Sequence, residues 1–118
     1  ALTVWGDPAR IEQVLVNLLS NALRHTAKGE VNVRIYTEED FLWIAVSDTG
    51  IGISEADLPH VFERFWRADR SRDRASGGSG IGLAVSRRLV ALQGGKIVAK
   101  SRLGEGSTFS FSLPMRPV

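Results

Sequence analysis

A carboxylate stands directly before two closely spaced glycines in the segment SDTGIGI, residues 47–53. Asp48 ends an apolar alternating run, and the alternation turns its side chain toward the side of the strand that is expected to be buried. A buried carboxylate is costly unless it accepts hydrogen bonds, while Gly50 and Gly52 would let a backbone or a flat ligand come close. Asp48 is therefore satisfied either by local turn amides or by a donor on a ligand.

Two asparagines lie one helical turn apart in the apolar-periodic segment EQVLVNLLSNALRHT, residues 12–26. Asn17 and Asn21 sit at the margin of the apolar stripe, although asparagine competes with the helix backbone for hydrogen bonds. Carboxamide oxygens can ligate a hard cation such as Mg²⁺. The alternative is a solvated polar face of the helix.

A second glycine cluster, GGSGIG, occupies residues 77–82 and runs into the last expected helix. Its backbone N–H groups would lie at the positive end of that helix and could bind a phosphate, although a flexible hinge would have the same composition. The cluster is no dinucleotide-binding fingerprint, because no strand precedes it, and no Walker loop, because no Gly-Lys-Ser/Thr follows. Residues 64–80 carry five arginines and are expected to form a solvated, mobile loop, from which one arginine could reach a phosphate.

Two long helices and one short helix are expected to position these groups. Asp7 caps the first helix and Pro8 lies in its first turn. The short helix is expected over residues 55–63, and the last helix runs from Ile81 to a left-handed stop at Gly94–Gly95. The residues expected to form the buried stripes are Ile11, Val14, Leu15, Leu18, Leu19, Ala22 and Leu23 in the first helix and Ala84, Val85, Leu89 and Leu92 in the last.

The remaining apolar segments alternate as strands do. Residues 2–5 suggest a short first strand, residues 31–37 and 41–48 a hairpin, and residues 96–100 and 107–113 a second hairpin. The side chains expected to point inward in the first strand of the first hairpin are Val31, Val33 and Ile35. This order predicts an α/β fold, a two-layer α/β sandwich with a mixed, mostly antiparallel sheet and helices on one face.

Composition limits the classes of function. The 118 residues, 43% hydrophobic and 24% charged, suit one domain spanning residues 1–118. A net charge of +2 is too small an excess to indicate nucleic-acid binding. The absence of cysteine excludes disulfides and thiolate metal sites, and no apolar run approaches the roughly 18 residues of a membrane span. Because the chain starts at Ala1, we expect it to be a piece of a longer protein.

Together, these motifs resemble the catalytic and ATP-binding domain of sensor histidine kinases, in the GHKL superfamily that includes gyrase, Hsp90 and MutL. EQVLVNLLSNALRHT resembles the asparagine box, DTGIGI the first glycine box, FERFWR (62–67) the phenylalanine box, GGSGIGLAV the second glycine box and GEGSTFSFSLP the closing strand. The resemblance covers nearly the whole chain. It implies the Bergerat-type ATP-binding fold, with residues 66–80 as an ATP lid.

The resemblance implies ATP and Mg²⁺ as cofactors and gives the candidate residues their roles. Asp48 would accept a hydrogen bond from the exocyclic amine of adenine, Asn21 would ligate Mg²⁺, and Asn17, with a catalytic role, would lie near the metal waters and the phosphates. Arg67, also catalytic, would bind the γ-phosphate, and Thr108 would lie near a water beside adenine. The other residues implied to bind ATP are Arg24 (in place of a usual lysine), His25 (in place of a usual tyrosine), Gly50, Gly52, Ile53, Gly78, Gly80, Ile81, Gly82 and Leu83.

The same resemblance implies that the domain donates the γ-phosphoryl group of ATP to a histidine on a separate dimerisation and phosphoacceptor hairpin. Neither His25 nor His60 is followed by the family's acceptor motif, so we expect neither to be phosphorylated. The amide of Asn17 cannot take a proton as the glutamate of related ATPases does there, so hydrolysis should be slow. The parent is expected to be a membrane-anchored bacterial sensor that signals to a response regulator, with this domain in the cytoplasm and monomeric when isolated.

Two alternatives to an ATP-binding kinase domain belong to other classes of protein. The first is a regulatory module of the same fold that has no nucleotide affinity and binds partners through its arginine-rich segment. The second is a nucleic-acid-binding module that uses the same arginines. The acids Glu63, Asp69 and Asp73, interleaved with the arginines, argue against the second alternative, and we expect no nucleic-acid partner.

Overall fold

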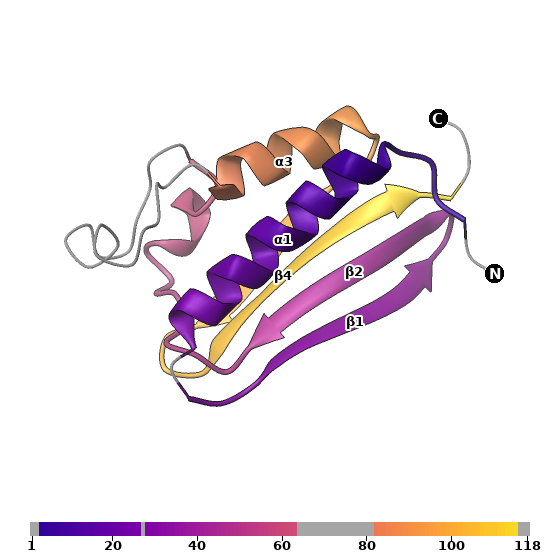
Figure 1. The fold of residues 1–118 in the computed structure, drawn as a ribbon. Coiled ribbons are helices and arrows are strands. Elements are labelled where there is room, and N and C mark those ends of the chain that lie inside the picture. The colour runs from indigo at the N-terminus through magenta and orange to yellow at the C-terminus, as the bar shows by residue number, and fades with distance from the viewer. Residues whose placement is uncertain (1–2, 27, 64–81, 116–118) are drawn as a thin grey trace.

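The computed structural model describes residues 3–26, 28–63 and 82–115, and within them two helices cover one face of a sheet (Figure 1). The helical elements are α1 (Pro8–His25), the short 3₁₀ helix η1 (Leu58–His60) and α3 (Gly82–Leu92). The strands are β1 (Val31–Glu38), β2 (Phe41–Asp48), β3 (Ile97–Arg102) and β4 (Gly106–Pro114). The strand order is β1-β2-β4-β3. The two-layer α/β sandwich is confirmed, but the expected mixed sheet is corrected, because all three ladders between the described strands are antiparallel.

The first helix begins where its capping residues indicate. The Asp7 carboxylate accepts a hydrogen bond from the Ala9 backbone N–H at 2.9 Å, and Pro8 occupies the first helical position, where its missing N–H costs nothing. Val14, Leu18 and Ala22 are buried against the sheet. Leu23 is exposed, so the expected stripe was one residue too wide on that flank.

The two central strands, β2 and β4, carry most of the core. Alternate residues of β2 and β4 point toward the helices, while the residues between them lie on the uncovered face. The buried apolar residues of the sheet on the helix side are Leu42, Ile44, Val46, Phe109, Phe111 and Leu113. Asp48 continues this series of alternate residues in β2. The alternation that turns the apolar side chains into the core therefore also turns this carboxylate inward.

The edge strand β1 differs from the sequence-based expectation. Val33 and Ile35 lie directly opposite Val46 and Ile44 in the β1–β2 ladder, and therefore on the helix side, yet they are 47% and 59% exposed. Figure 1 shows that α1 lies over the middle of the sheet and that β1 forms its outer edge. The alternation gave the correct face, but the helix layer does not reach this strand.

Three further expectations are corrected. Residues 3–5 form no strand and have only one backbone hydrogen bond to the sheet, from Trp5 N to Pro114 O at 2.8 Å. The helix expected over 55–63 is reduced to η1 and flanking turns, because Pro59 in its middle has no N–H to donate. In α3, Ser86 and Val90 are the buried residues, whereas Val85 and Leu92 are exposed.

Candidate functional site

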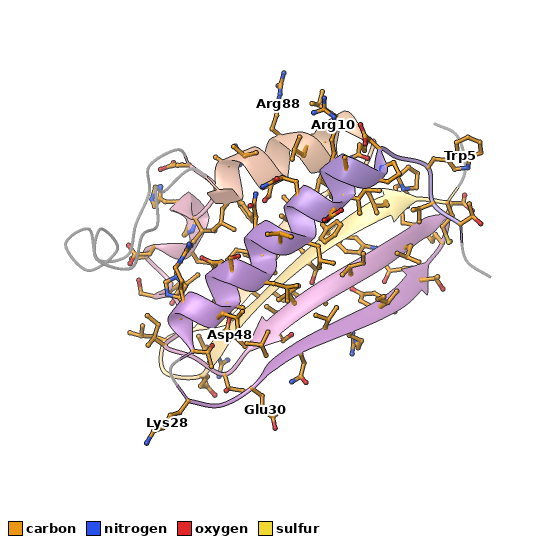
Figure 2. All side chains as sticks on the ribbon, in the orientation of Figure 1. Trp5, Arg10, Lys28, Glu30, Asp48 and Arg88 are labelled. Carbon is orange, nitrogen blue, oxygen red and sulfur yellow. The ribbon has the colours of Figure 1, made fainter. Side chains whose placement is uncertain are left out.

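The Asp48 carboxylate lies at the end of β2, close to the C-terminal end of α1 (Figure 2). It is only 7% exposed, and its Oδ1 accepts a hydrogen bond from the Gly50 backbone N–H at 2.9 Å. Within the described part of the chain, no donor reaches the second oxygen, Oδ2. The turn therefore satisfies only one oxygen of this carboxylate. The other oxygen is left as a hydrogen-bond acceptor for a group outside the described residues.

A small pocket surrounds this carboxylate. The residues that line it are Asn21, His25, Asp48, Ile51, Gly52, Ile53, Leu83, Ser107 and Phe109. They come from α1, from the end of β2 and the turn after it, from the first turn of α3 and from β4. Five of the residues expected to bind a nucleotide besides Asp48 meet there, namely Asn21, His25, Gly52, Ile53 and Leu83.

The turn after β2 requires glycine at two positions because backbone presses on it from both sides. A Cβ atom on Gly50 would collide with the carbonyl of His25 at the end of α1. Gly52 has a φ of +73°, and a Cβ there would collide with the carbonyl of Arg102 in β3. Ile51 N donates to His25 O at 3.2 Å, which fixes this turn to α1. The two glycines therefore let the turn fit between α1 and the β3–β4 hairpin.

The two asparagines of α1 have different surroundings. Asn21 is buried and lines the pocket. Asn17, one turn earlier, is half-buried and donates hydrogen bonds to the first turn of α3, at Gly82 O (3.2 Å) and Ser86 Oγ (3.1 Å). Neither belongs to a merely solvated face. Arg24, in the last turn of α1, is exposed and lies outside the pocket lining.

The structure places Thr108 on the wrong face for the expected contact beside adenine. Its hydroxyl forms a hydrogen bond with that of Ser47 at 2.9 Å, on the sheet face away from the helices. Ser107, directly opposite Asp48 in the β2–β4 ladder, lines the pocket instead. Side chains alternate along a strand, so residue 107 lies on the same face as the inward-pointing Phe109. The sequence alone therefore indicated Ser107, and not Thr108, as the residue on the pocket side, and this indication was missed.

The pocket has a volume of about 20 Å³, little more than one water molecule needs. A purine base would therefore enter only after lining side chains move. The polar groups nevertheless suit one, because a buried acceptor and a flat glycine turn face the same cavity. Among the described residues, no three His, Cys, Asp or Glu side chains gather into a metal site, so a metal here would depend on the oxygen of Asn21 and on the ligand's own oxygens.

Several expected site residues lie outside the residues that the structure describes. These are Arg67, Gly78, Gly80 and Ile81, together with the whole segment 66–80 that was expected to form a lid. Gly82 is described and is the first residue of α3.

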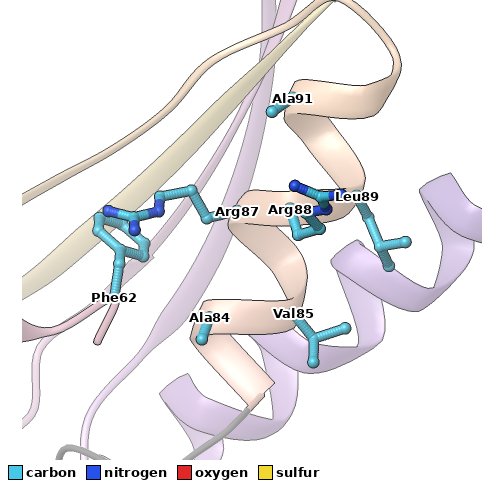
Figure 3. A pocket seen from close by; sticks show the side chains of 7 residues that line it. All are labelled: Phe62, Ala84, Val85, Arg87, Arg88, Leu89 and Ala91. Carbon is cyan, nitrogen blue, oxygen red and sulfur yellow. The ribbon is translucent and has the colours of Figure 1, made fainter. Parts of the chain in front are cut away.

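A second, larger groove of about 600 Å³ lies on the outer side of α3 (Figure 3). Its lining residues are Phe62, Ala84, Val85, Arg87, Arg88, Leu89 and Ala91. The Arg87 guanidinium lies over the Phe62 ring at 5.8 Å, and that ring packs edge-on against Phe109 at 6.0 Å. None of the residues expected to bind a nucleotide lines this groove, so the smaller pocket is the better candidate.

A two-layer sandwich in which an inward-facing aspartate, an asparagine and a glycine turn share one pocket is the arrangement of a catalytic ATP-binding domain. The chain belongs to the family of histidine kinase-, DNA gyrase B- and HSP90-like ATPases, whose model matches residues 6–117. Histidine kinases are among its curated relatives. It is 42% identical over 118 residues to sensor histidine kinase WalK of Bacillus subtilis and 46% identical over 110 residues to the circadian input-output histidine kinase CikA of Synechococcus elongatus.

These alignments cover 98% and 92% of this chain but only 19% and 15% of the two relatives, so the chain spans a small part of their length. Among solved structures, it is similar to full-length ShkA in complex with AMPPNP, with a TM-score of 0.83 and 28% identity over 100% of this chain and 24% of that one. The mycobacterial sensor histidine kinase MprB gives a TM-score of 0.82 and 30% identity, over 98% of this chain and 76% of that one. Neither described helix is long and apolar enough to cross a membrane.

Proposed function

We propose that this domain binds Mg²⁺-ATP and donates the γ-phosphoryl group to a histidine on a separate dimerisation domain of a two-component sensor histidine kinase. The observation that carries the proposal is the buried Asp48 carboxylate, which keeps one acceptor oxygen and lines a pocket together with Asn21. Membership of the ATPase family and the similarity to ShkA, solved with AMPPNP, support it.

Asp48 is proposed to select the base. Adenine has an exocyclic amine that can donate to the carboxylate, whereas guanine presents a carbonyl oxygen at that edge. Two acceptors would then face each other in a buried site, and leaving a buried polar group unpaired costs about 1 to 3 kcal/mol. Ser107, opposite Asp48, donates to Ser101 Oγ at 2.8 Å, because the Ser101 hydroxyl uses its own hydrogen on Gly106 O, and the Ser107 oxygen can still accept from a water beside the base. We therefore expect ATP to bind more tightly than GTP.

Asn21 is the residue proposed to hold Mg²⁺, since its carboxamide oxygen is a hard ligand in the same pocket. When bound, the ion would neutralise charge on the phosphates. Arg67 is proposed to contact the γ-phosphate, and the backbone of residues 78–82 to hold the phosphate chain. The amide of Asn17 cannot take a proton from water, which keeps hydrolysis slow and the phosphoryl group available for an acceptor imidazole.

The acceptor is proposed to lie on the helical hairpin of the parent kinase, with a response regulator as the next partner. His25 and His60 are the two histidines of this chain, and neither is proposed as acceptor. His60 Nδ1 lies 3.1 Å from Glu63 Oε2 on the surface at η1, outside the pocket that holds Asp48. A membrane-anchored bacterial parent with this domain in the cytoplasm remains part of the proposal.

Calorimetric titration of the chain with a non-hydrolysable ATP analogue, with and without Mg²⁺, tests the binding step. We expect binding that Mg²⁺ strengthens and that the matching GTP analogue does not reproduce. A folded protein that binds neither nucleotide would contradict the proposal and favour the regulatory module.

For the transfer step, the parent's hairpin is supplied in trans with labelled ATP, and acid-labile phosphate is expected on the hairpin. Label on His25 or His60 of the isolated domain would contradict the proposed division of roles.

A further inference from the structure

Asn17 belongs to a chain of hydrogen bonds that joins the exposed side of α1 to the first turn of α3. Gln13 Nε2 donates to Asn17 Oδ1 at 2.9 Å. Asn17 Nδ2 donates in turn to Gly82 O at 3.2 Å and to Ser86 Oγ at 3.1 Å, and Ser86 Oγ donates to Gly82 O at 2.9 Å. Ser86 is completely buried, whereas Gln13 is exposed. This series of hydrogen bonds therefore runs from solvent to the interior of the domain.

The donors and acceptors in this series of hydrogen bonds determine which end of the Asn17 carboxamide faces α3. The Gly82 carbonyl can only accept, and the Ser86 hydroxyl already uses its hydrogen on that carbonyl. Both partners therefore require an N–H from Asn17. The Asn17 oxygen must then face Gln13, which lies four residues earlier on the same side of the helix. An inverted amide would place oxygen against oxygen at Gly82.

We propose that Gln13 and Ser86 are positioning residues that hold the Asn17 carboxamide with its oxygen as the one group left to contact a ligand. The Asn17 amide nitrogen donates to two partners on α3, while its oxygen accepts one hydrogen bond and keeps a second lone pair. An amide oxygen can bind a metal ion or accept from a metal-bound water, but it cannot donate to a phosphate oxygen.

This inference rests on the proposed function and narrows it. The Asn17 oxygen would contact the metal ion or a metal-bound water, and not a phosphate oxygen. Neither Gln13 nor Asn17 lines the small pocket around Asp48. Gln13, the more exposed of the two, would act only through Asn17. Ser86 would act on Asn17 and also on Gly82, where the glycine-rich segment enters α3.

The test compares Gln13→Met with the matched control Val16→Met. Gln13→Met removes the donor and keeps the length of the side chain, while Val16→Met places methionine on another exposed position of α1. The Kd of a non-hydrolysable ATP analogue is measured with and without Mg²⁺. In Gln13→Met, we expect the gain in affinity due to Mg²⁺ to fall about 3- to 10-fold, the equivalent of one ordinary hydrogen bond. The Kd without Mg²⁺ should not change, and Val16→Met should behave as the parent chain.

Ser86→Ala gives a second route to the same readout. It removes one acceptor of the Asn17 amide and one donor to Gly82, so the Mg²⁺-dependent gain should fall at least as far as in Gln13→Met. Nuclear magnetic resonance supplies a readout that does not depend on nucleotide. The side-chain amide signals of Asn17 should shift in both variants, and those of Asn21 should shift less.

The outcomes separate this inference from the proposed function. A parent chain that binds no nucleotide would overturn both. A parent chain with Mg²⁺-dependent binding, together with a Gln13→Met variant that keeps the full Mg²⁺ gain, would overturn the positioning role alone. An equal loss of affinity with and without Mg²⁺ would also overturn it, since that result would indicate a purely structural role.

Discussion

Asp48 and Ser107 lie directly opposite each other in the β2–β4 ladder, and both line the pocket at the end of α1. Their sequence neighbours Ser47 and Thr108 also lie opposite each other but bond through their hydroxyls on the other face of the sheet. One ladder thus provides a polar pair toward the pocket and a separate polar pair toward solvent. The alternation of side chains along β4 therefore determines that the hydroxyl of Ser107, and not that of Thr108, can contact a ligand in the pocket.

This arrangement predicts opposite results for two neighbouring substitutions. Ser107→Ala should weaken binding of an ATP analogue about 3- to 10-fold, because it removes a hydroxyl oxygen that can accept from a water beside the base. Thr108→Val should leave the affinity within about 2-fold, since its hydroxyl faces away. Calorimetry on both variants checks the pair. Equal losses in the two variants, or a larger loss in Thr108→Val, would show that the base lies elsewhere.

Asp48→Asn should reduce both the affinity for ATP and the discrimination against GTP. The carboxamide keeps the size of the side chain but replaces one acceptor oxygen with a donor, which can pair with the guanine carbonyl. A loss of about 1 to 3 kcal/mol for the ATP analogue, or about 5- to 150-fold in Kd, is expected. Parallel titrations with ATP and GTP analogues provide the measurement. An unchanged preference for ATP in a folded variant would exclude Asp48 as the selecting group.

Two glycines with similar backbone conformations should respond very differently to alanine. Gly52 (φ +73°) and Gly104 (φ +84°) both adopt the left-handed region, but a Cβ on Gly52 would meet the Arg102 carbonyl, whereas one on Gly104 would meet nothing within 4 Å. Gly104→Ala should cost about 1 kcal/mol for the left-handed conformation alone. Gly52→Ala should cost about 3 kcal/mol or more, because the turn must also move. The free energy of unfolding in urea distinguishes the two, and similar losses would contradict the close contact at Gly52.

Val33 and Val46 face each other across the β1–β2 ladder and test whether the helix layer reaches the edge of the sheet. Val46 is 1% exposed, so Val46→Ala should lower the free energy of unfolding by about 2 to 3 kcal/mol. Val33→Ala removes a half-exposed side chain and should cost less than about 1 kcal/mol. Chemical denaturation of both variants gives the comparison. A large loss at Val33 would mean that another part of the molecule covers β1 in solution.

These contrasts also show how far the sequence could predict the structure. The cap at Asp7, the turn after Glu38 and the stop at Gly94 are local signals, and the elements they delimit are found where they were expected. Alternation correctly assigned Val33 and Ile35 to the helix side. It could not show that they stay exposed, because that depends on how far α1 and α3 extend over the sheet.

The candidate site was predictable to a similar extent. Motif resemblance selected Asn21, Asp48, Gly52, Ile53 and Leu83, and the structure brings these residues together. It chose Thr108 over Ser107 because a motif names a stretch of chain and not the face on which each residue lies. The hydrogen bonds of Asn17 with Gly82 and Ser86 were not predictable, because they join positions more than sixty residues apart through the packing of α1 against α3.

The β3–β4 hairpin is tied to the glycine turn next to Asp48, because Gly104 N donates to Ile51 O and Ile53 N donates to Ser101 Oγ, each at 2.7 Å. Leu103, at the tip of this hairpin, is exposed and does not line the pocket. An environment-sensitive dye attached there would sense displacement of the turn without obstructing the cavity. The hairpin thus offers a labelling position from which occupancy could be followed optically in real time.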